Sequence, residues 1–372
     1  MKVKKRILLL LLIVVLAATS LVGCSKKETG QKPTDDTETV DDYKINLGYY
    51  NCDHMVGACI GEAAGIYKDL GLNVEITGGG KVPEAIAAGK MDAGYIWAQG
   101  VIGANVLGSP IVIGANNHIG GSRYLVVSSD IEKPEDIIGQ KMASSDPAIS
   151  AEWLCGYKYQ LDLPLDAEAY ELVNVGSDAD KYVALATGQI KAMTCCDPWG
   201  SMAEYEGTGR IIGINKEMEE KMGICCSFAL NENFVKDHPE LAKKLTLAHT
   251  KSIEYVYSHP YKAAEIFAEY YDVPLEVSLM TIYKKTIGEG RTLSWELKEE
   301  NLNHLFDMIK KHNLLENVPE TLDESVNLEV LNSCGAKDFD TFIKEEIDPI
   351  FPLGMTYEEF KKKAMEIDGI DE

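Results

Sequence analysis

Apolar and polar positions follow the same order twice along residues 43–231. In each copy, short apolar runs of strand length alternate with segments whose apolar residues recur at helical spacing. The first copy predicts strand 45–50, helix 56–69, strand 73–77, helix 82–88 and strand 92–97. The second copy predicts strand 140–144, helix 148–160, strand 171–175, helix 180–187 and strand 191–196. Strands that alternate with helices favour right-handed parallel units, so the pattern predicts two α/β lobes.

A short sequence repeat marks the same place in both copies. Residues 84–97 (EAIAAGKMDAGYIW) align with residues 183–196 (VALATGQIKAMTCC), and Ala-x-Ala-x-Gly recurs in both. Gly89 and Gly188 stand where a helix ends on a glycine and a strand follows. Ligands of parallel α/β sheets bind beyond the carboxyl ends of the strands. The segments after residues 97 and 196 are therefore predicted to line one cleft from opposite sides.

The remaining chain completes the first lobe and then becomes helical. The apolar segments PIVIGA and YLVVSS are interpreted as completing the first lobe and leading out of it. Beyond Asn231, apolar residues recur at helical spacing over 233–258 and 260–271, with prolines near the starts of elements. Residues 335–372 are expected to form a helical appendage, with Pro349 and Pro352 as breaks.

The first 42 residues predict export and attachment to a membrane. A basic start is followed by an apolar run from Ile7 to about Ala18, which is shorter than the roughly 20 residues that span a bilayer. Leu21-Val22-Gly23-Cys24 resembles the lipobox of bacterial lipoproteins, in which the cysteine is lipidated and becomes the new N-terminus. An ordinary cleaved signal with a chance cysteine is the alternative. Residues 25–42 are polar and predict a solvated tether.

These observations divide the chain into six expected parts. They are a signal peptide (1–23), the lipidated cysteine with its tether (24–42), the first part of lobe 1 (43–127), lobe 2 (128–224), the second, mostly helical part of lobe 1 (225–334) and the appendage (335–372). The expected location is the extracytoplasmic face of a bacterial cell membrane.

The charge balance excludes several partners. The chain has 36 Lys and Arg against 59 Asp and Glu, for a net charge of −23. Loss of residues 1–23 removes four bases and no acid, which lowers the net charge to −27. Such a surface repels nucleic acid and anionic lipid head groups, so the lipid is expected to be the membrane attachment. We expect a monomer.

Two pairs of adjacent cysteines raise the question of metal or redox chemistry. They lie in MTCCDPWG (193–200) and GICCSFAL (223–230). Neighbouring Cα atoms lie about 3.8 Å apart, under the usual disulfide span of about 4.4–6.8 Å, so Cys195 and Cys196 are not expected to bridge each other. They either bond elsewhere or stay reduced. No zinc-type spacing or Cys-x-x-Cys occurs, and Cys52, His54 and the two pairs could converge only through the fold. The sequence favours small packing thiols, and no metal or cofactor is predicted.

The loops that follow the predicted strands supply candidate ligand-binding residues. In the first lobe these are Asn51, Asp53, His54, Gly78, Gly79, Gly80, Trp97 and Gln99. Near the crossover they are Gly121 and Ser122, and in the second lobe Ser144, Ser145, Asp146, Cys196, Asp197 and Trp199. Each has a plainer structural interpretation: the Asp residues as helix caps, His54 as a structural side chain, the glycines as a flexible turn, and the tryptophans as core.

Several segments resemble a known family. The lipobox, AAGIYKDLGLNVEI, AIAAGKMDAGYI, KPEDIIGQKMA, LATGQIKAM with DPW, and ENFVKDHPELAKKL are similar to the nitrate/sulfonate/taurine group of solute-binding proteins of ATP-binding-cassette (ABC) importers. That group includes relatives that bind pyrimidine precursors of thiamin. The similarity covers about residues 44–290. It implies a two-lobed α/β fold of the periplasmic-binding-protein type II class, with hinge crossover strands and a helical C-terminal part.

The resemblance also implies a function without chemistry. The lobes would close on a small organic ligand or oxyanion and deliver it to an ABC permease and ATPase. The same candidate residues, by position, would form the pocket. Few Arg or Lys residues occur there, so Asp197, the tryptophans and the thiols favour a neutral, aromatic or amine-bearing ligand. The alternatives are a thiamin-pyrimidine-synthase-like or metal- or thiol-dependent enzyme on the same fold, and a sensory receptor.

Overall fold

The computed structural model describes residues 43–371 except positions 51, 80, 122, 145–160, 165, 215–222 and 312. The signal peptide, Cys24, the tether and the helix predicted over 148–160 lie outside the described residues and stay predictions. Among the helices that are described, none combines the length and the apolar character that crossing a bilayer requires.

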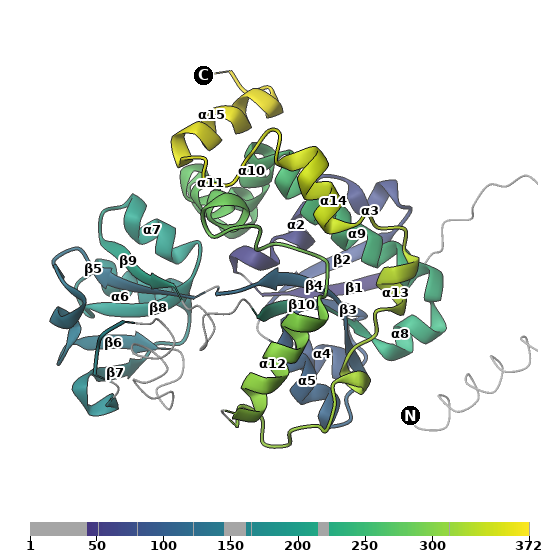
Figure 1. Ribbon diagram of the computed structural model, residues 1–372, viewed down its shortest axis with the longest axis horizontal. Coiled ribbons are helices and arrows are strands. Elements are labelled where there is room, and N and C mark those ends of the chain that lie inside the picture. Colours follow the sequence, from purple (N-terminus) through teal and green to yellow (C-terminus); the bar gives the residue numbers. More distant parts are fainter. Residues whose placement is uncertain are drawn as a thin grey trace, which may run out of the picture. The chain divides into compact units, whose positions relative to one another are not determined.

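The first sheet has the strand order β2-β1-β3-β10-β4 (Figure 1). Its strands are β1 (Lys44–Tyr49), β2 (Asn73–Gly78), β3 (Ala93–Trp97), β4 (Ile111–Ile119) and β10 (Ile224–Asn231). The helices that follow these strands are α2 (Gly57–Ala63), α3 (Ile66–Asp69), α4 (Val82–Ala87) and α5 (Ala98–Val106). Side chains alternate across β3, so Tyr95 and Ile96 join separate hydrophobic clusters on the two faces of the sheet.

The second sheet has the strand order β7-β6-β8-β5-β9. Its strands are β5 (Arg123–Ser128), β6 (Lys141–Ser144), β7 (Glu171–Asn174), β8 (Ala192–Cys196) and β9 (Gly209–Ile214). Its helices are α6 (Asp178–Ala186), α7 (Trp199–Tyr205) and the short η2 (Pro134–Ile137) and η4 (Ala167–Ala169). The same alternation places Leu125 and Val126 of β5 in different clusters.

The strands of the predicted repeat units match the structure closely, but one crossover strand lies in a different sheet from the one predicted. The strand YLVVSS was expected to belong to the first lobe, whereas β5 pairs with β8 and β9 in the second sheet. β10 in turn returns to the first sheet, between β3 and β4. Both strands run antiparallel to their neighbours, because each enters its sheet by crossing from the other one. The two lobes are therefore joined by two crossovers, β4 to β5 and β9 to β10.

The helix predicted over 56–69 is also interrupted. Gly65 has a φ of 78°, a left-handed conformation that glycine adopts at little cost, and α2 and α3 lie on either side of it.

The rest of the chain is helical. Its elements are α8 (Glu232–Asp237), α9 (Pro239–Ser258), α10 (Pro260–Tyr271), α11 (Leu275–Tyr283), the π-helix η5 (Lys284–Gly288), α12 (Glu299–Lys311), η6 (Asp323–Ser325), α13 (Glu329–Ser333), α14 (Phe339–Phe342), the π-helix η7 (Ile343–Ile347) and α15 (Tyr357–Asp368). Pro239 and Pro260 start their helices, where a missing backbone N–H costs nothing.

The C-terminal segment belongs to the body of the first lobe. Phe342 and Phe360 are buried in the same hydrophobic cluster as Leu47 of the central strand β1. The hydroxyl of Tyr283 donates to the carbonyl oxygen of Met355 over 2.8 Å. The segment expected to be an appendage therefore packs against α10 and α11 and helps to fix the position of η5, which follows α11 directly.

Candidate functional site

The strand ends of the two sheets meet at a backbone hydrogen bond. The 3-10 helix η1 (Asp53–Met55) follows β1, and α7 begins just after β8. The N–H of Asp53 donates to the carbonyl oxygen of Asp197 over 3.0 Å. Two segments that the sequence predicts to share a cleft are therefore in contact.

Asp53 is a buried carboxylate held between an imidazole and an ammonium group. Its side-chain oxygens lie 3.0 Å from Nδ1 of His54 and 3.2 Å from Nζ of Lys285. Burial by itself would raise the pKa of Asp53, but the positive charge of Lys285 and the hydrogen bond from His54 hold that pKa well below its usual range. Asp53 is therefore ionised at neutral pH although it is removed from water.

Two consecutive lysines at the start of η5 serve different lobes. Nζ of Lys285, besides contacting Asp53, donates to Glu289 over 2.7 Å. Nζ of Lys284 lies 3.7 Å from the carboxylate of Asp197 and donates to the hydroxyl of Ser201 over 2.9 Å. Burial opposes the charge of each lysine, but the neighbouring carboxylates raise both pKa values. The first two residues of η5 thus neutralise the buried carboxylates of Asp197 and Asp53.

His54 is placed by contacts on every side of its ring. Nδ1 faces Asp53, and Nε2 lies 3.4 Å from the sulfur of Cys52. The ring stacks on His118 of β4 at a centroid distance of 4.9 Å, and Asn117 donates to the backbone carbonyl of His54 over 2.6 Å. Burial alone would lower the pKa of His54, but Asp53 raises it above its usual value.

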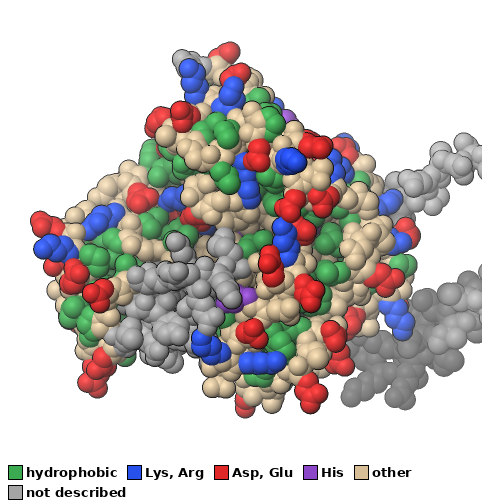
Figure 2. Space-filling model, in the orientation of Figure 1, with side chains coloured by type: hydrophobic (Ala, Val, Ile, Leu, Met, Phe, Trp, Pro, Cys, Tyr) green, Lys and Arg blue, Asp and Glu red, His purple; other side chains and the backbone are tan. Residues whose placement is uncertain are grey.

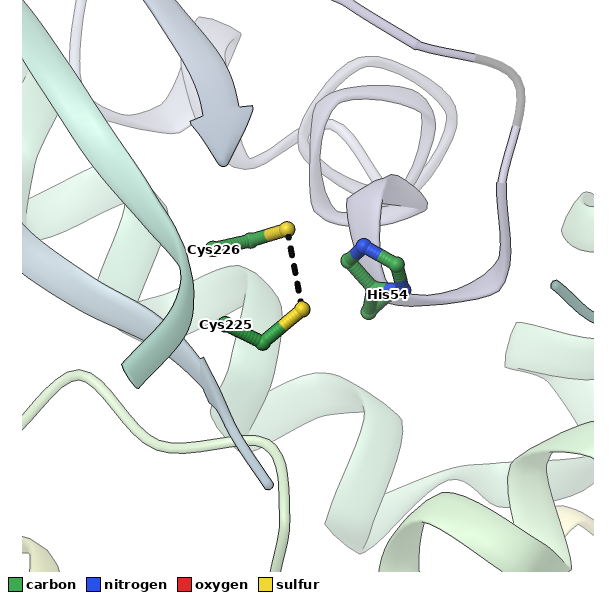
Figure 3. A group of neighbouring side chains, drawn as sticks. All are labelled: His54, Cys225 and Cys226. Atoms are coloured by element: carbon green, nitrogen blue, oxygen red, sulfur yellow. Dashed lines mark hydrogen bonds between the residues drawn. The ribbon is translucent and has the colours of Figure 1, made fainter. Parts of the chain in front are cut away.

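The cysteine pair of β10 lies beside His54. The two sulfur atoms of Cys225 and Cys226 are 3.5 Å apart, and Figure 3 shows both pointing toward the imidazole. Adjacent residues of a regular strand point to opposite faces, but register shifts on either side of Cys226 mark a β-bulge at this end of β10. The two thiols are hydrogen-bonded to each other, and this bond together with the nearby imidazole lowers the pKa of Cys225 against the opposing effect of burial.

The cysteine pair of β8 has different surroundings. Cys195 is fully buried in the cluster that contains Met193, whereas Cys196 lies on the other side of the strand. The Arg123 guanidinium is 3.7 Å from the sulfur of Cys196, and the backbone N–H of Cys196 donates to Asp178 over 2.9 Å. Burial raises the pKa of both thiols. None of the seven described cysteines is in a disulfide.

Asp197 is buried and has a structural role. Its carboxylate is fully buried and accepts 2.8 Å hydrogen bonds from the N–H and the hydroxyl of Ser201, with Thr281 at 3.4 Å. These bonds fix the first turn of α7. Trp199, in the same turn, is partly buried and packs against Tyr182 in a tilted arrangement with ring centroids 5.9 Å apart.

Trp97 is the large aromatic side chain that the first lobe exposes at a strand end. It is 53 % exposed. A side chain at Gly100 would collide with its indole ring, so this glycine leaves the room that the ring occupies. Gln99 was expected beside Trp97, but its amide donates to the carbonyl oxygen of Leu314 over 2.8 Å and so ties α5 to the loop after α12.

The glycine candidates fall into two groups. Gly78 and Gly79 are exposed at the end of β2, and nothing lies within 4 Å of a side chain added at Gly79. Gly121, by contrast, is buried. Five candidates lie outside the described residues, namely Asn51, Gly80, Ser122, Ser145 and Asp146, and the same holds for the side chain of Ser144.

Two groups of described residues have the spacing of metal ligands. In each group the ligand atoms lie within 4.8 Å of one another; the groups are His54 with Cys225 and Cys226, and Cys52 with Asp53 and His54. The fold therefore brings together side chains from β10 and from the turn after β1, which the spacing along the sequence did not indicate.

Sequence reasoning missed the ionic framework of this site. Lys284 and Lys285 lie more than 80 positions after Asp197 in the chain. The available signal was their position directly after the apolar run VSLMTIY, since consecutive lysines on a buried helix need acidic partners.

Comparison with known proteins identifies relatives of this chain. A model of the NMT1-like family matches residues 38–270. The 4-amino-5-hydroxymethyl-2-methylpyrimidine phosphate synthase THI13 of Saccharomyces cerevisiae is 25% identical over 255 residues, which are 61% of this chain and 69% of that protein.

Solved structures show the same fold. The ligand-binding component of an ABC-type import system from Staphylococcus aureus, with zinc bound, has a TM-score of 0.61 at 14% identity and covers 79% of this chain and 99% of its own. The periplasmic aliphatic sulphonate binding protein SsuA from Escherichia coli has a TM-score of 0.61 at 13% identity and covers 76% and 92%. These likenesses confirm the predicted fold class of two-lobed solute-binding proteins.

Proposed function

This chain belongs to the NMT1-like family, and on that premise we propose that it is a solute-binding protein that captures a small organic molecule between its lobes and releases it unchanged. The observation that carries the proposal is the meeting of strand ends at Asp53 and Asp197 between two sheets joined by two crossovers. Such a pair of lobes can open and close by bending at the crossovers.

We further propose that the ligand is neutral and aromatic rather than an oxyanion. The cations at the strand ends already have carboxylate partners: Lys284 contacts Asp197, Lys285 contacts Asp53, and Arg123 contacts Asp178. An oxyanion would have to compete with one of these buried carboxylates. The exposed indole of Trp97 offers a flat apolar surface instead, on which a ring can stack.

The attachment and the partners complete the proposal. We propose that Cys24 carries a lipid and that the body acts at the extracytoplasmic face of the membrane, where it passes its ligand to an ABC permease and ATPase. An acidic surface suits this arrangement, because it does not adsorb to anionic lipid. Figure 2 shows acidic side chains in several groups on the visible face.

Ligand screening tests the proposal. The full-length chain, purified in mild detergent, is screened by thermal shift against pyrimidines, flavins, amines, sulfonates and nitrate. Trp97→Ala should weaken the binding free energy of an aromatic ligand by about 0.5–1.5 kcal/mol. It should leave the melting temperature of the ligand-free protein unchanged. Tyr205, another exposed aromatic residue, supplies the matched control Tyr205→Ala.

Two results would count against this function. A sulfonate or nitrate that stabilises the protein more than every neutral ring would reject the ligand class. A bound compound that mass spectrometry recovers in altered form would favour the rival function, an enzyme related to THI13, for which the cluster of thiols beside His54 is the relevant observation.

A further inference from the structure

We propose that the first lobe also binds one thiophilic metal ion, of the Zn(II) or Cu(I) class, beside the organic ligand. The donors are His54, Cys225 and Cys226, with Cys52 beside them. This inference departs from the expectation of no metal that the sequence spacing supports, and it holds whether the protein carries its organic ligand or transforms it.

The distances between donor atoms fit a tetrahedral ion. Zinc–sulfur and zinc–nitrogen bonds of about 2.3 and 2.05 Å at tetrahedral angles place two sulfurs about 3.8 Å apart and a sulfur about 3.6 Å from a nitrogen. The sulfurs of Cys225 and Cys226 are 3.5 Å apart, and Cys52 lies 3.4 Å from Nε2 of His54. The ligand atoms of His54, Cys225 and Cys226 lie within 4.8 Å of one another, so a single ion can bind these three, and Cys52 lies beside them at Nε2 of His54.

The bulge in β10 lets Cys225 and Cys226 bind the same metal ion. Without it, one of the two thiols would face the opposite side of the sheet, as in β8. With it, both sulfurs point toward His54 (Figure 3). Bulges are common next to functional sites because they redirect a side chain.

His54 is oriented as a metal ligand commonly is. Asp53 accepts the proton of Nδ1, which leaves the lone pair of Nε2 directed at Cys52. Asp53 is itself fixed by Lys285 and by its backbone bond to the second lobe. The carboxylate therefore acts as a positioning group behind the imidazole.

A second imidazole supplies an independent observation. His118 is fully buried, stacks on His54 and makes a side-chain hydrogen bond with Cys225, so a second imidazole lies against the same donors. On β4 it is paired in register with Cys226, so a metal-bound thiolate there gives the ring a charged acceptor nearby.

The donor set selects the metal class. Thiolate and imidazole donors favour Zn(II) and Cu(I), whereas Mg(II) and Ca(II) prefer oxygen. Cys52 and Cys225 are only partly buried, so the site can be reached from solvent. Each thiol that binds the ion passes its proton to solvent.

Cobalt(II) is the probe that tests the site. The full-length chain is stripped of metal with a chelator and a phosphine reductant under argon, and Co(II) is then titrated in. We expect one ion per chain, a near-ultraviolet sulfur-to-cobalt charge-transfer band and intense visible bands of tetrahedral cobalt. Zn(II) should displace the cobalt, and a Cu(I) titration against a chromophoric competitor separates the two candidate metals.

Variants assign the donors. Cys225→Ser and Cys226→Ser should each remove most of the charge-transfer band, and His54→Ala should weaken cobalt binding at least 10-fold, as ligand loss exceeds the 10–100-fold effect of outer-shell changes. Cys334→Ser, which changes a partly buried thiol at the C-terminal cap of α13, is the matched control and should bind as the wild type does. Circular dichroism of each metal-free variant establishes that it is folded.

The proposal fails on either of two outcomes. Wild-type protein that is fully reduced and shows no charge-transfer band has no such site. A band that survives in folded Cys225→Ser and Cys226→Ser protein, at wild-type strength, places the metal on other residues.

Discussion

The strand ends of the two lobes contain the same kinds of residue in different arrangements. Each has a pair of adjacent cysteines, a buried aspartate and one lysine of η5. In the second lobe these residues hold the structure: Asp197 fixes α7, and Cys195 fills the core. In the first lobe, Asp53 orients His54 toward sulfur atoms.

The difference teaches that backbone register, rather than the cysteine motif, determines what adjacent thiols can do. β8 is regular, so Cys195 and Cys196 point to opposite faces and cannot share a ligand. β10 is bulged, so Cys225 and Cys226 point the same way. The four predictions below test this contrast, from the largest expected effect to the smallest.

The largest effect should come from the two lysines. Lys285→Met leaves Asp53 buried without its cation, and we expect it to lower the free energy of unfolding by about 3–5 kcal/mol. Lys284→Met should cost less, about 1.5–3 kcal/mol, because Asp197 keeps its bonds to Ser201. Guanidinium unfolding followed by tryptophan fluorescence measures both. Equal losses would show that the two buried acids depend on their lysines equally.

The two aspartates should differ in their effect on cobalt affinity. Asp53→Asn is expected to weaken Co(II) binding about 10–100-fold, since the amide no longer accepts the His54 proton as strongly. Asp197→Asn is the matched change at the other strand end and should leave the affinity unaltered. A competition titration against a chelator of known affinity measures the difference, and a loss of affinity in both variants would contradict it.

The cysteines should differ in their contribution to stability. Cys195→Ser buries a hydroxyl among apolar side chains and should cost about 1–3 kcal/mol. Cys225→Ser, at a partly buried position, should change the metal-free stability by no more than about 0.5 kcal/mol. Urea unfolding in the presence of a chelator compares them. A larger cost at Cys225 would mean that the bulged pair is part of the packing.

The smallest expected effect is on the pH dependence of stability. Asp197 and Asp53 should change it in opposite directions. The pKa of Asp197 is raised, because burial outweighs the attraction of Lys284, so the folded state keeps its proton to a higher pH than the unfolded chain. The stability that Asp197 contributes therefore falls as pH rises from its unfolded pKa of about 3.9 through its raised value. Asp53, whose pKa is lowered, contributes stability above about 3.9 that is lost as pH falls below it.

Replacing each aspartate by asparagine reveals how its contribution to stability changes with pH. As pH rises from 3 to 7, the stability of Asp197→Asn should improve relative to wild type, whereas that of Asp53→Asn should decline. Unfolding midpoints of both variants across this range give the two signs, and slopes of the same sign would contradict the opposed pKa shifts.

The sequence predicted the parts of this fold that depend on local pattern. The repeat ending in Gly89 and Gly188 gave β3 and β8 to within a residue, because helix stops and apolar alternation are local signals. The place of β5 in the second sheet was not predictable in this way. An apolar strand is the same in either sheet, and its partners lie far away in the chain.

The candidate site shows the same limit. The turn at Asp53 and His54 was identified from its place after a strand. The bulge that turns Cys225 toward His54 leaves no mark in the sequence, and the pairing of Asp53 with Lys285 spans more than 200 positions. Charge partners at that separation are visible only when the chain is folded.

The place of Lys284 and Lys285 in the chain has a practical consequence. The stretch that identifies the family ends at residue 270, before these two lysines begin. A survey of genomes that trims every homologue to that stretch would discard the side chains that neutralise both buried acids. Sorting untrimmed homologues by whether they keep this dipeptide would give evolutionary groups that a trimmed alignment merges.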